Sequence, residues 1–239
     1  MSYIEEYLPR ISDFNCYGRL SYEAILQILE TAGSHHSDTV GDFVIESSQG
    51  GIAWILAEWK VQILHHTDSK EKLQIATWVR GKAPTSAVYR DFIITDRNGS
   101  EVIRAEAKFA LFDLNTQRLT RISEDLFASY KPDEKMVFEK APRLRAPLKF
   151  TSEKELKLRR SDIDFNGHVH NTRYIVFALD ALPEDVYAKD DFSEIQIVYS
   201  KPVNEQDQVI TKYTRTEDGH FVGIYADDVL CALIVVKER

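Results

Sequence analysis

The densest group of polar side chains in the chain lies between residues 159 and 171. Within it an acid, an amide and an imidazole alternate as Asp164, Asn166 and His168. In an extended segment, alternate residues point to the same side of the backbone. A carboxylate there could act as a base or orient the histidine, and an amide could hold a water or a carbonyl group. This combination indicates hydrolysis of an activated acyl group.

The same residues have two other interpretations. Asp164 and Asn166 precede an apolar helical pattern, and both residue types are common helix N-caps, so capping alone would explain them. His168 and His170 could bind a metal, but no third ligand stands at a diagnostic spacing. We therefore expect no metal site and no cofactor.

Cysteine chemistry is not expected either. The chain has two cysteines, Cys16 and Cys231, and neither belongs to a C-x-x-C pair. Cys231 lies in an apolar run, where a small buried residue is expected. The sequence therefore predicts neither a disulfide framework nor a covalent thiol mechanism.

A helix must follow the polar group. From Tyr174 to Leu182 only Asp180 is polar, and Pro183 ends the run, so we expect a buried helix whose first N–H groups could stabilise a developing oxyanion. In the first half, residues 21–33 show apolar residues at helical spacing. Ser21 is a suitable N-cap and Gly33 a suitable left-handed stop for that helix.

The two halves share a short repeat. Asp13-Phe14-Asn15 recurs as Asp164-Phe165-Asn166, which is an offset of 151 residues. After each predicted helix, alternating apolar residues predict antiparallel strands. These strands cover 54–64, 73–79, 88–95 and 102–112 in the first half, and 194–199, 209–214, 221–225 and 229–236 in the second. The dipeptides Asn98-Gly99 and Asp218-Gly219 suit type I′ hairpin turns.

These elements predict an α+β protein with a tandem, or double, hotdog fold, in which each antiparallel sheet wraps around a central helix. The length of 239 residues falls between one large domain and two small ones. Pro132, Pro142 and Pro147 indicate a linker at 131–150. It would separate an N-terminal domain at 1–130 from a C-terminal domain at 151–239.

Composition narrows the class of partner. The net charge of −8 argues against general binding to nucleic acid or to an anionic membrane. The longest apolar run is Val229 to Val236, far shorter than the roughly 20 residues that span a bilayer. The first residues are acidic where a secretory signal would be basic and then apolar. We expect a cytoplasmic protein that binds neither nucleic acid nor membrane.

The stretch from Asp162 to Ile175 resembles the D-x-D-x-N-x-H-V-x-N-x-x-Y-[IL] signature of acyl-acyl carrier protein (acyl-ACP) thioesterases. Residues 54–61, 76–79, 89–92 and 119–122 are also similar to the N-terminal domain of that family. The resemblance implies hydrolysis of a fatty acyl-ACP thioester to free fatty acid and ACP, which ends chain elongation. It implies an acyl-chain pocket in the N-terminal domain and catalysis in the C-terminal domain by Asp164, Asn166 and His168.

One position departs from the family pattern. Plant members carry Glu-Cys in the strand that begins with a tyrosine, where this chain has Pro202-Val203. Glu205 could substitute only if the alignment shifts. The general base therefore stays open between Asp164 and His168.

Acyl carrier proteins are acidic, so an acidic enzyme needs a local basic surface to bind one. Residues 140–160 are rich in Lys and Arg, although such a run is also typical of an ordinary solvated linker. The candidate partner-binding residues are Arg143, Arg145, Lys149, Arg159, Arg160 and Arg173.

Three points stay open at this level. An acyl-CoA thioesterase would use the same chemistry with a different carrier, and a non-catalytic acyl-thioester sensor could use the same fold. The chain length and saturation of the acyl group are not encoded in any motif. A tandem repeat can form within one chain the dimer that single hotdogs make, which leaves both a monomer and a homodimer open.

Overall fold

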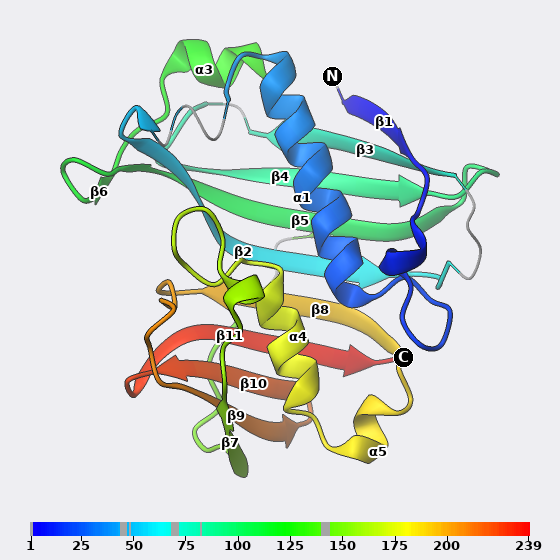
Figure 1. Cartoon of the computed structure of the whole chain (residues 1–239). Coiled ribbons are helices and arrows are strands. Elements are labelled where there is room, and N and C mark those ends of the chain that lie inside the picture. Colours follow the sequence, from blue (N-terminus) through cyan, green and yellow to red (C-terminus); the bar gives the residue numbers. More distant parts are fainter. Residues whose placement is uncertain (1, 44–46, 48, 68–71, 82, 140–143) are drawn as a thin grey trace. The chain divides into compact units, whose positions relative to one another are not determined.

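The computed structural model describes residues 2–43, 47, 49–67, 72–81, 83–139 and 144–239 (Figure 1). The chain divides into two compact units, Met1–Ala141 and Pro142–Arg239. The division lies inside the predicted linker at 131–150, but the start of that segment is bound to the first unit. Asp133 N donates to Val79 O at 3.0 Å, and Trp78 Nε1 donates to Lys135 O at 2.9 Å. The exact domain boundaries stay a prediction.

The first unit is an antiparallel sheet with one long helix, α1 (Tyr22–Thr39), laid across it (Figure 1). The strand order is β1-β3-β4-β5-β2, and α1 packs against β1 and β3. The strands are β1 (Tyr3–Tyr7), β2 (Ile52–Ile63), β3 (Leu73–Arg80), β4 (Ala87–Thr95) and β5 (Glu101–Asp113), with the short β6 (Arg118–Leu119) paired to β5. The short helices are η1 (Ile11–Asp13) and α3 (Glu124–Ser129).

Helix α1 begins as predicted and ends later than predicted. Ser21 caps it, because its side chain accepts a hydrogen bond from Ala24 N at 3.1 Å. Gly33 does not stop the helix, which continues to Thr39. A side chain at Gly33 would contact Arg90 Cδ at 3.4 Å, so this glycine allows the buried Arg90 to lie against the helix. The prediction of a left-handed stop at Gly33 was wrong.

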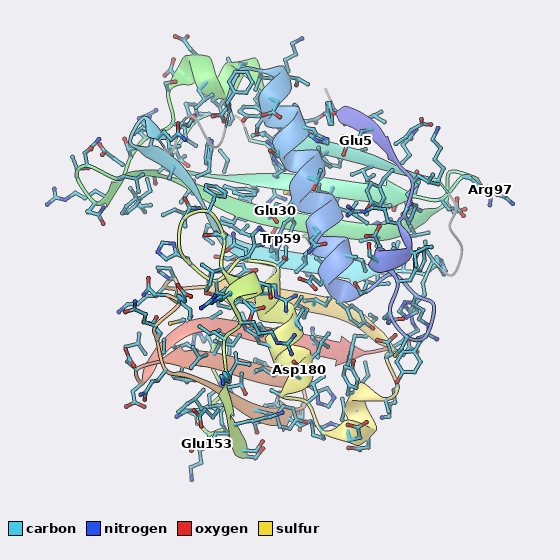
Figure 2. All side chains as sticks on the ribbon, viewed as in Figure 1. Glu5, Glu30, Trp59, Arg97, Glu153 and Asp180 are labelled. Carbon is cyan, nitrogen blue, oxygen red and sulfur yellow. The ribbon has the colours of Figure 1, made fainter. Side chains whose placement is uncertain are left out.

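The second unit has the same construction with a shorter helix, α4 (Arg173–Asp180), which packs against β10 and β11 (Figure 1). The strand order is β8-β11-β10-β9-β7. The strands are β7 (Ser152–Leu156), β8 (Phe192–Tyr199), β9 (Val209–Thr216), β10 (Gly219–Ala226) and β11 (Val229–Glu238), and the remaining short helices are η2 (Arg160–Asp162) and α5 (Glu184–Tyr187). Half of the residues of α4 are buried, and Asp180, labelled in Figure 2, lies exposed at its last turn.

The hairpin turns differ from the predicted type. A type I′ turn needs positive φ at both central residues. At the first dipeptide only Gly99 has positive φ, and its N–H donates to Asp96 O at 3.0 Å, so Asn98-Gly99 does not form that turn. The pair with positive φ at both positions is Asp227 (47°) and Asp228 (64°), which joins β10 to β11. The type I′ conformation therefore occurs at an Asp-Asp pair rather than at the Asn-Gly or Asp-Gly dipeptides.

Across the described part of the chain, no helix is both long enough and apolar enough to cross a membrane.

Candidate active site

Asp164, Asn166 and His168 lie in one tight loop of the second unit. Asp164 N donates to His168 O at 2.7 Å, and Gly167 N donates to Asp164 O at 3.1 Å. Gly167 has a φ of 80°, a conformation that glycine adopts without strain. The loop is flanked by a bridge between Ile163 and Val169. The segment thus turns on itself at Gly167, so the alternation expected of an extended segment does not apply here.

The carboxylate of Asp164 holds this loop closed. Its Oδ1 accepts hydrogen bonds from Asn166 N at 2.8 Å and from His168 N at 3.2 Å. Within the part of the chain that the structure describes, no hydrogen bond reaches Oδ2. Asp164 and His168 are half-buried, whereas Asn166 is exposed. Asp164 therefore contacts the backbone of His168, not its imidazole.

The loop is anchored by Asp162, which is 1% exposed. Its Oδ2 accepts from Arg159 N at 2.8 Å, and its Oδ1 accepts from Arg173 Nε at 2.9 Å. Its backbone carbonyl accepts from His170 N at 2.8 Å. Arg173 is the first residue of α4, so this ion pair ties the loop to the helix. Arg173, a candidate for partner binding, thus pairs with an internal carboxylate.

His170, not Asp164 or Asn166, interacts with the start of α4. Its Nδ1 accepts from Thr172 N at 3.3 Å and lies 3.0 Å from Thr172 Oγ1. Asp164 instead binds the amides of its own loop. The interpretation of Asp164 as a helix cap is therefore wrong.

A second segment lies beside the loop. Val169 N donates to Val203 O at 2.8 Å, and His168 forms a bridge with Asn204. Tyr174 Oη accepts from Val203 N at 3.2 Å, which fixes this segment to α4. Val203 is buried and Glu205 is exposed. Sequence reasoning missed Asn204, for which the only local signal was its spacing from Asp207, typical of a turn.

Cys231 is not suited to nucleophilic attack. Cys231 is buried, and burial raises the pKa of its thiol, which keeps it protonated. Cys16 is exposed on the first unit. The residues that the structure describes contain no group of three or more His, Cys, Asp or Glu that could hold a metal ion.

The first unit carries a loop with the same hydrogen bonds. Asn15 N donates to Arg19 O at 2.8 Å, and Asn15 Oδ1 accepts from Tyr17 N at 3.0 Å and from Arg19 N at 3.1 Å. Gly18 has a φ of 74° and donates to Asn15 O. Asp13 accepts from Arg10 N at 2.7 Å, as Asp162 accepts from Arg159 N. Asp13 thus corresponds to Asp162, and Asn15 to Asp164.

This correspondence corrects the repeat. The two loops are related by an offset of 149 residues, from Asp13 to Asp162, and not by the 151 residues that matched Asp-Phe-Asn to Asp-Phe-Asn. In the correct register, Arg10, Ser12, Asp13 and Gly18 match Arg159, Ser161, Asp162 and Gly167. The three candidate catalytic positions are occupied in the first unit by Asn15, Tyr17 and Arg19. The two units share the backbone frame but differ in the side chains at these three candidate positions.

The candidate partner-binding residues lie near the second loop in the chain. Arg145, Lys149, Arg159 and Arg160 are exposed, and all belong to the second unit. Arg143 lies outside the described residues. From 144 to 160 the sequence has six basic and two acidic residues, so the local charge is positive on a chain whose net charge is −8.

Two units that each combine an antiparallel sheet with a central helix define a double-hotdog protein. The chain belongs to the acyl-ACP thioesterase family. The family model for the acyl-ACP thioesterase N-terminal domain matches residues 1–130, and that for the C-terminal domain matches residues 146–228.

Relatives of known sequence include plant enzymes. The chain is 28% identical over 245 residues to the chloroplastic oleoyl-acyl carrier protein thioesterase of Coriandrum sativum, covering 91% of this chain and 63% of that protein. It is 26% identical to oleoyl-acyl carrier protein thioesterase 1 of Arabidopsis thaliana, covering 90% of this chain and 64% of that protein. The chain thus spans somewhat less than two thirds of the length of these relatives.

Solved structures confirm the fold. An acyl-ACP thioesterase from Bacteroides thetaiotaomicron superposes with a TM-score of 0.88 at 20% identity, covering 100% of this chain and 98% of the other. The 12:0-ACP thioesterase from Umbellularia californica gives a TM-score of 0.85 at 15% identity, covering 100% and 97%. The predicted α+β, tandem hotdog architecture is therefore confirmed.

Proposed function

We propose that this protein hydrolyses fatty acyl thioesters carried on acyl carrier protein, releasing free fatty acid and ACP and so ending chain elongation. Family membership supports the reaction class, and the relatives' names supply the substrate class. The observation that carries the proposal is the carboxylate of Asp164, placed where the matching loop has a neutral amide.

The two loops have the same backbone hydrogen bonds but different residues at the position of Asp164, where the first loop has Asn15. Asn15 closes its loop with one amide oxygen, so the frame does not need a negative charge. Asp164 closes the second loop in the same way with Oδ1, which leaves Oδ2 available to a ligand. A half-buried charge is costly to desolvate, and side chains that are not needed for the fold are typical of functional sites.

The proposed reaction is direct attack of water. Asp164 or His168 accepts a proton from the water as its oxygen bonds to the thioester carbonyl carbon. The tetrahedral intermediate then releases the carrier thiol, which takes up a proton, and the fatty acid. Asn166 holds the water or the carbonyl oxygen through its exposed side-chain amide. No covalent enzyme intermediate is required.

The proposal assigns the acyl chain to the first unit and the reaction to the second. The acidic carrier would bind the exposed basic residues Arg145, Lys149, Arg159 and Arg160, with Arg143 and Arg173 as further candidates. Opposite charges at a wet surface are screened by salt, so binding through them should weaken as ionic strength rises.

The test is a hydrolysis assay across C8 to C18 substrates, saturated and unsaturated, on matched ACP and CoA carriers. We expect Asp164→Asn to fold normally, as the Asn15 loop does, and to lose about 10²–10⁴-fold in kcat. The matched control is Asn15→Asp, which places the same charge in the first loop and should leave kcat unchanged. We also expect KM for acyl-ACP to rise with salt, whereas KM for acyl-CoA changes less.

Near-normal turnover by folded Asp164→Asn would overturn the catalytic assignment. Equal rates on CoA and ACP substrates would instead favour an acyl-CoA thioesterase, and no turnover by the wild-type protein on any substrate would favour a sensor. The cytoplasmic location and the homodimer remain predictions.

A further inference from the structure

The loop leaves one question about its histidine. Asp164 holds the backbone of His168 but makes no hydrogen bond to its ring. An imidazole that is to accept a proton from water needs a fixed orientation and a defined tautomer, which a hydrogen bond at its other nitrogen normally provides. The residue that supplies this bond should lie on the same face as His168.

We propose that Asn204 is the positioning residue of His168, and that Asp207 in turn fixes Asn204. This inference rests on the proposed function and deepens it. In the role proposed, Asn204 Oδ1 accepts a hydrogen bond from one ring nitrogen of His168, so that the other nitrogen presents its lone pair to the water.

The backbone pairing places the two side chains together. His168 and Asn204 are opposite each other in an antiparallel bridge, and the flanking bond is Val169 N to Val203 O at 2.8 Å. Because the flanking residues carry this bond, His168 and Asn204 form a non-hydrogen-bonded pair. Side chains of such a pair lie on the same face, with Cβ atoms about 4.5–5.5 Å apart. This separation is within reach of an amide and an imidazole.

Three hydrogen bonds then fix Asn204. Asp207 N donates to Asn204 O at 3.2 Å, and Asp207 Oδ2 accepts from both Asn204 N at 2.8 Å and Asn204 Nδ2 at 3.1 Å. A carboxylate only accepts, so the amide must turn its NH₂ group to Asp207. The carbonyl oxygen Oδ1 then points away from Asp207 and is the end that can accept from a ring N–H.

The charged groups near the loop are not placed to make the proposed contact. Asp164 uses Oδ1 for two backbone amides of its own loop. Asn204 and Glu205 are both exposed, but it is Asn204 that the bridge places opposite His168. This chain has Pro202 and the buried Val203 at the positions where plant members of the family carry Glu-Cys. The side chains of proline and valine cannot accept a hydrogen bond from the imidazole. An amide that orients a catalytic histidine also occurs in unrelated cysteine proteases, so the chemistry is sound.

The first test needs no substrate. The ring nitrogens of His168 are followed by ¹⁵N NMR in the full-length protein, with the wild type compared to Asn204→Ala, Asn204→Asp and Gln206→Ala. Gln206 is exposed on the same turn and is the matched control. We expect Asn204→Ala to change the ratio of the two neutral tautomers of His168, and Gln206→Ala to leave that ratio unchanged.

The second test is kinetic. We expect Asn204→Ala to lower kcat by about 10–100-fold, the usual effect of removing a supporting hydrogen bond, with little change in KM. Asn204→Asp restores an acceptor and adds a charge that stabilises the imidazolium, so it should recover part of kcat and move the acid limb of the kcat/KM profile to higher pH. Asn204→Ala should move the acid limb to lower pH, because it removes an acceptor that stabilises the imidazolium without adding a charge. A merely structural role for Asn204 would leave the limb of Asn204→Ala in place.

The two proposals fail in different ways. If Asn204→Ala leaves both the tautomer ratio and the pH profile unchanged, the positioning role is wrong even though the wild type hydrolyses acyl-ACP. If the tautomer ratio changes but no thioester is hydrolysed by any form, the contact is supported and the proposed function fails. The amide NMR spectrum of β8 to β11 shows whether each variant is folded.

Discussion

At the scale of single residues, Asp162 is a buried carboxylate on which the local structure of the second unit depends. It is 1% exposed, and it joins η2 and α4 through hydrogen bonds from Arg159 N and Arg173 Nε. A buried carboxylate is stable only when such partners replace water. Removing it leaves Arg173, which is 21% exposed at its side chain, without that partner. The geometry of the loop that carries Asp164 therefore depends on a residue that touches no substrate in the proposed mechanism.

We expect Asp162→Ala to lower the free energy of unfolding by about 3 kcal/mol, at the low end for a broken buried ion pair because Arg173 is partly solvated. The control is Asp180→Ala, an exposed position that should change stability by no more than about 0.5 kcal/mol. Urea denaturation of both variants measures the difference. Equal stabilities would mean that water replaces the carboxylate at no cost.

At the scale of elements, the β10–β11 turn uses residues that its conformation does not favour. Asp227 and Asp228 both have positive φ, which costs free energy for any residue with a side chain, although less for Asp than for most. In the β9–β10 turn, Asp218 does not have positive φ. The two turns thus place the same residue type in opposite backbone conformations.

Asp228→Gly should raise the free energy of unfolding by about 0.5 kcal/mol, because glycine adopts positive φ without a steric penalty. The same change at Asp218 should lower it by about 0.5–1 kcal/mol, because glycine there only adds freedom to the unfolded chain. Thermal unfolding of the pair gives the comparison. A shift of the same sign in both variants would contradict the assigned turn conformations.

Much of this element structure could be predicted from the sequence. All eight predicted strands occur, because each buries apolar residues, in an alternating pattern along β9 and as a continuous buried run in β11. Strands β1 and β7 were missed because they lie at sheet edges and consist largely of exposed or half-buried polar residues, as Glu153 on β7 shows (Figure 2). An edge strand needs less apolar sequence, so it gives a weaker pattern.

The sequence groups the candidate site residues in one segment but does not reveal the geometry of that segment. Asp164, Asn166 and His168 do share one loop, yet its shape depends on Gly167 and on backbone bonds that side-chain alternation does not reveal. The repeat was placed two residues out of register because the match used the reactive residues. Asn204 could not be predicted, since its pairing with His168 joins segments far apart in the chain.

At the scale of the whole molecule, two buried groups of the first unit give opposite pH responses. Burial, and after it the guanidinium of Arg90, whose Nη1 donates to His36 Nδ1 at 2.8 Å, together lower the pKa of His36 to about 4. Burial raises the pKa of Asp91 to about 6 against the opposing effect of Arg80, 3.5 Å away. Neutral His36 stabilises the fold above pH 6.5, and that stability is lost as the pH falls toward 4. Protonated Asp91 stabilises it below pH 3.8, and that stability is lost as the pH rises toward 6.

Between pH 4 and 6 these contributions, each on the order of 3 kcal/mol, largely cancel. We expect Asp91→Asn to make stability rise with pH across this window, and His36→Gln to make it fall. Urea denaturation at steps of pH gives the two slopes. Slopes of the same sign, or a flat response in both variants, would show that these two groups do not control the pH dependence.

The pair of matching loops also bears on how such proteins are found in genomes. The residues that the loops share, Arg10 with Arg159, Asp13 with Asp162 and Gly18 with Gly167, build the frame and perform no chemistry. A search pattern made from them would retrieve active and inactive copies alike. Under the proposed mechanism, a pattern that also requires an acid at 164 and a histidine at 168 would separate enzymes from sequences that have kept only the scaffold. For distant homologues, the informative sequence positions are therefore those at which the two matching loops of this chain carry different residues.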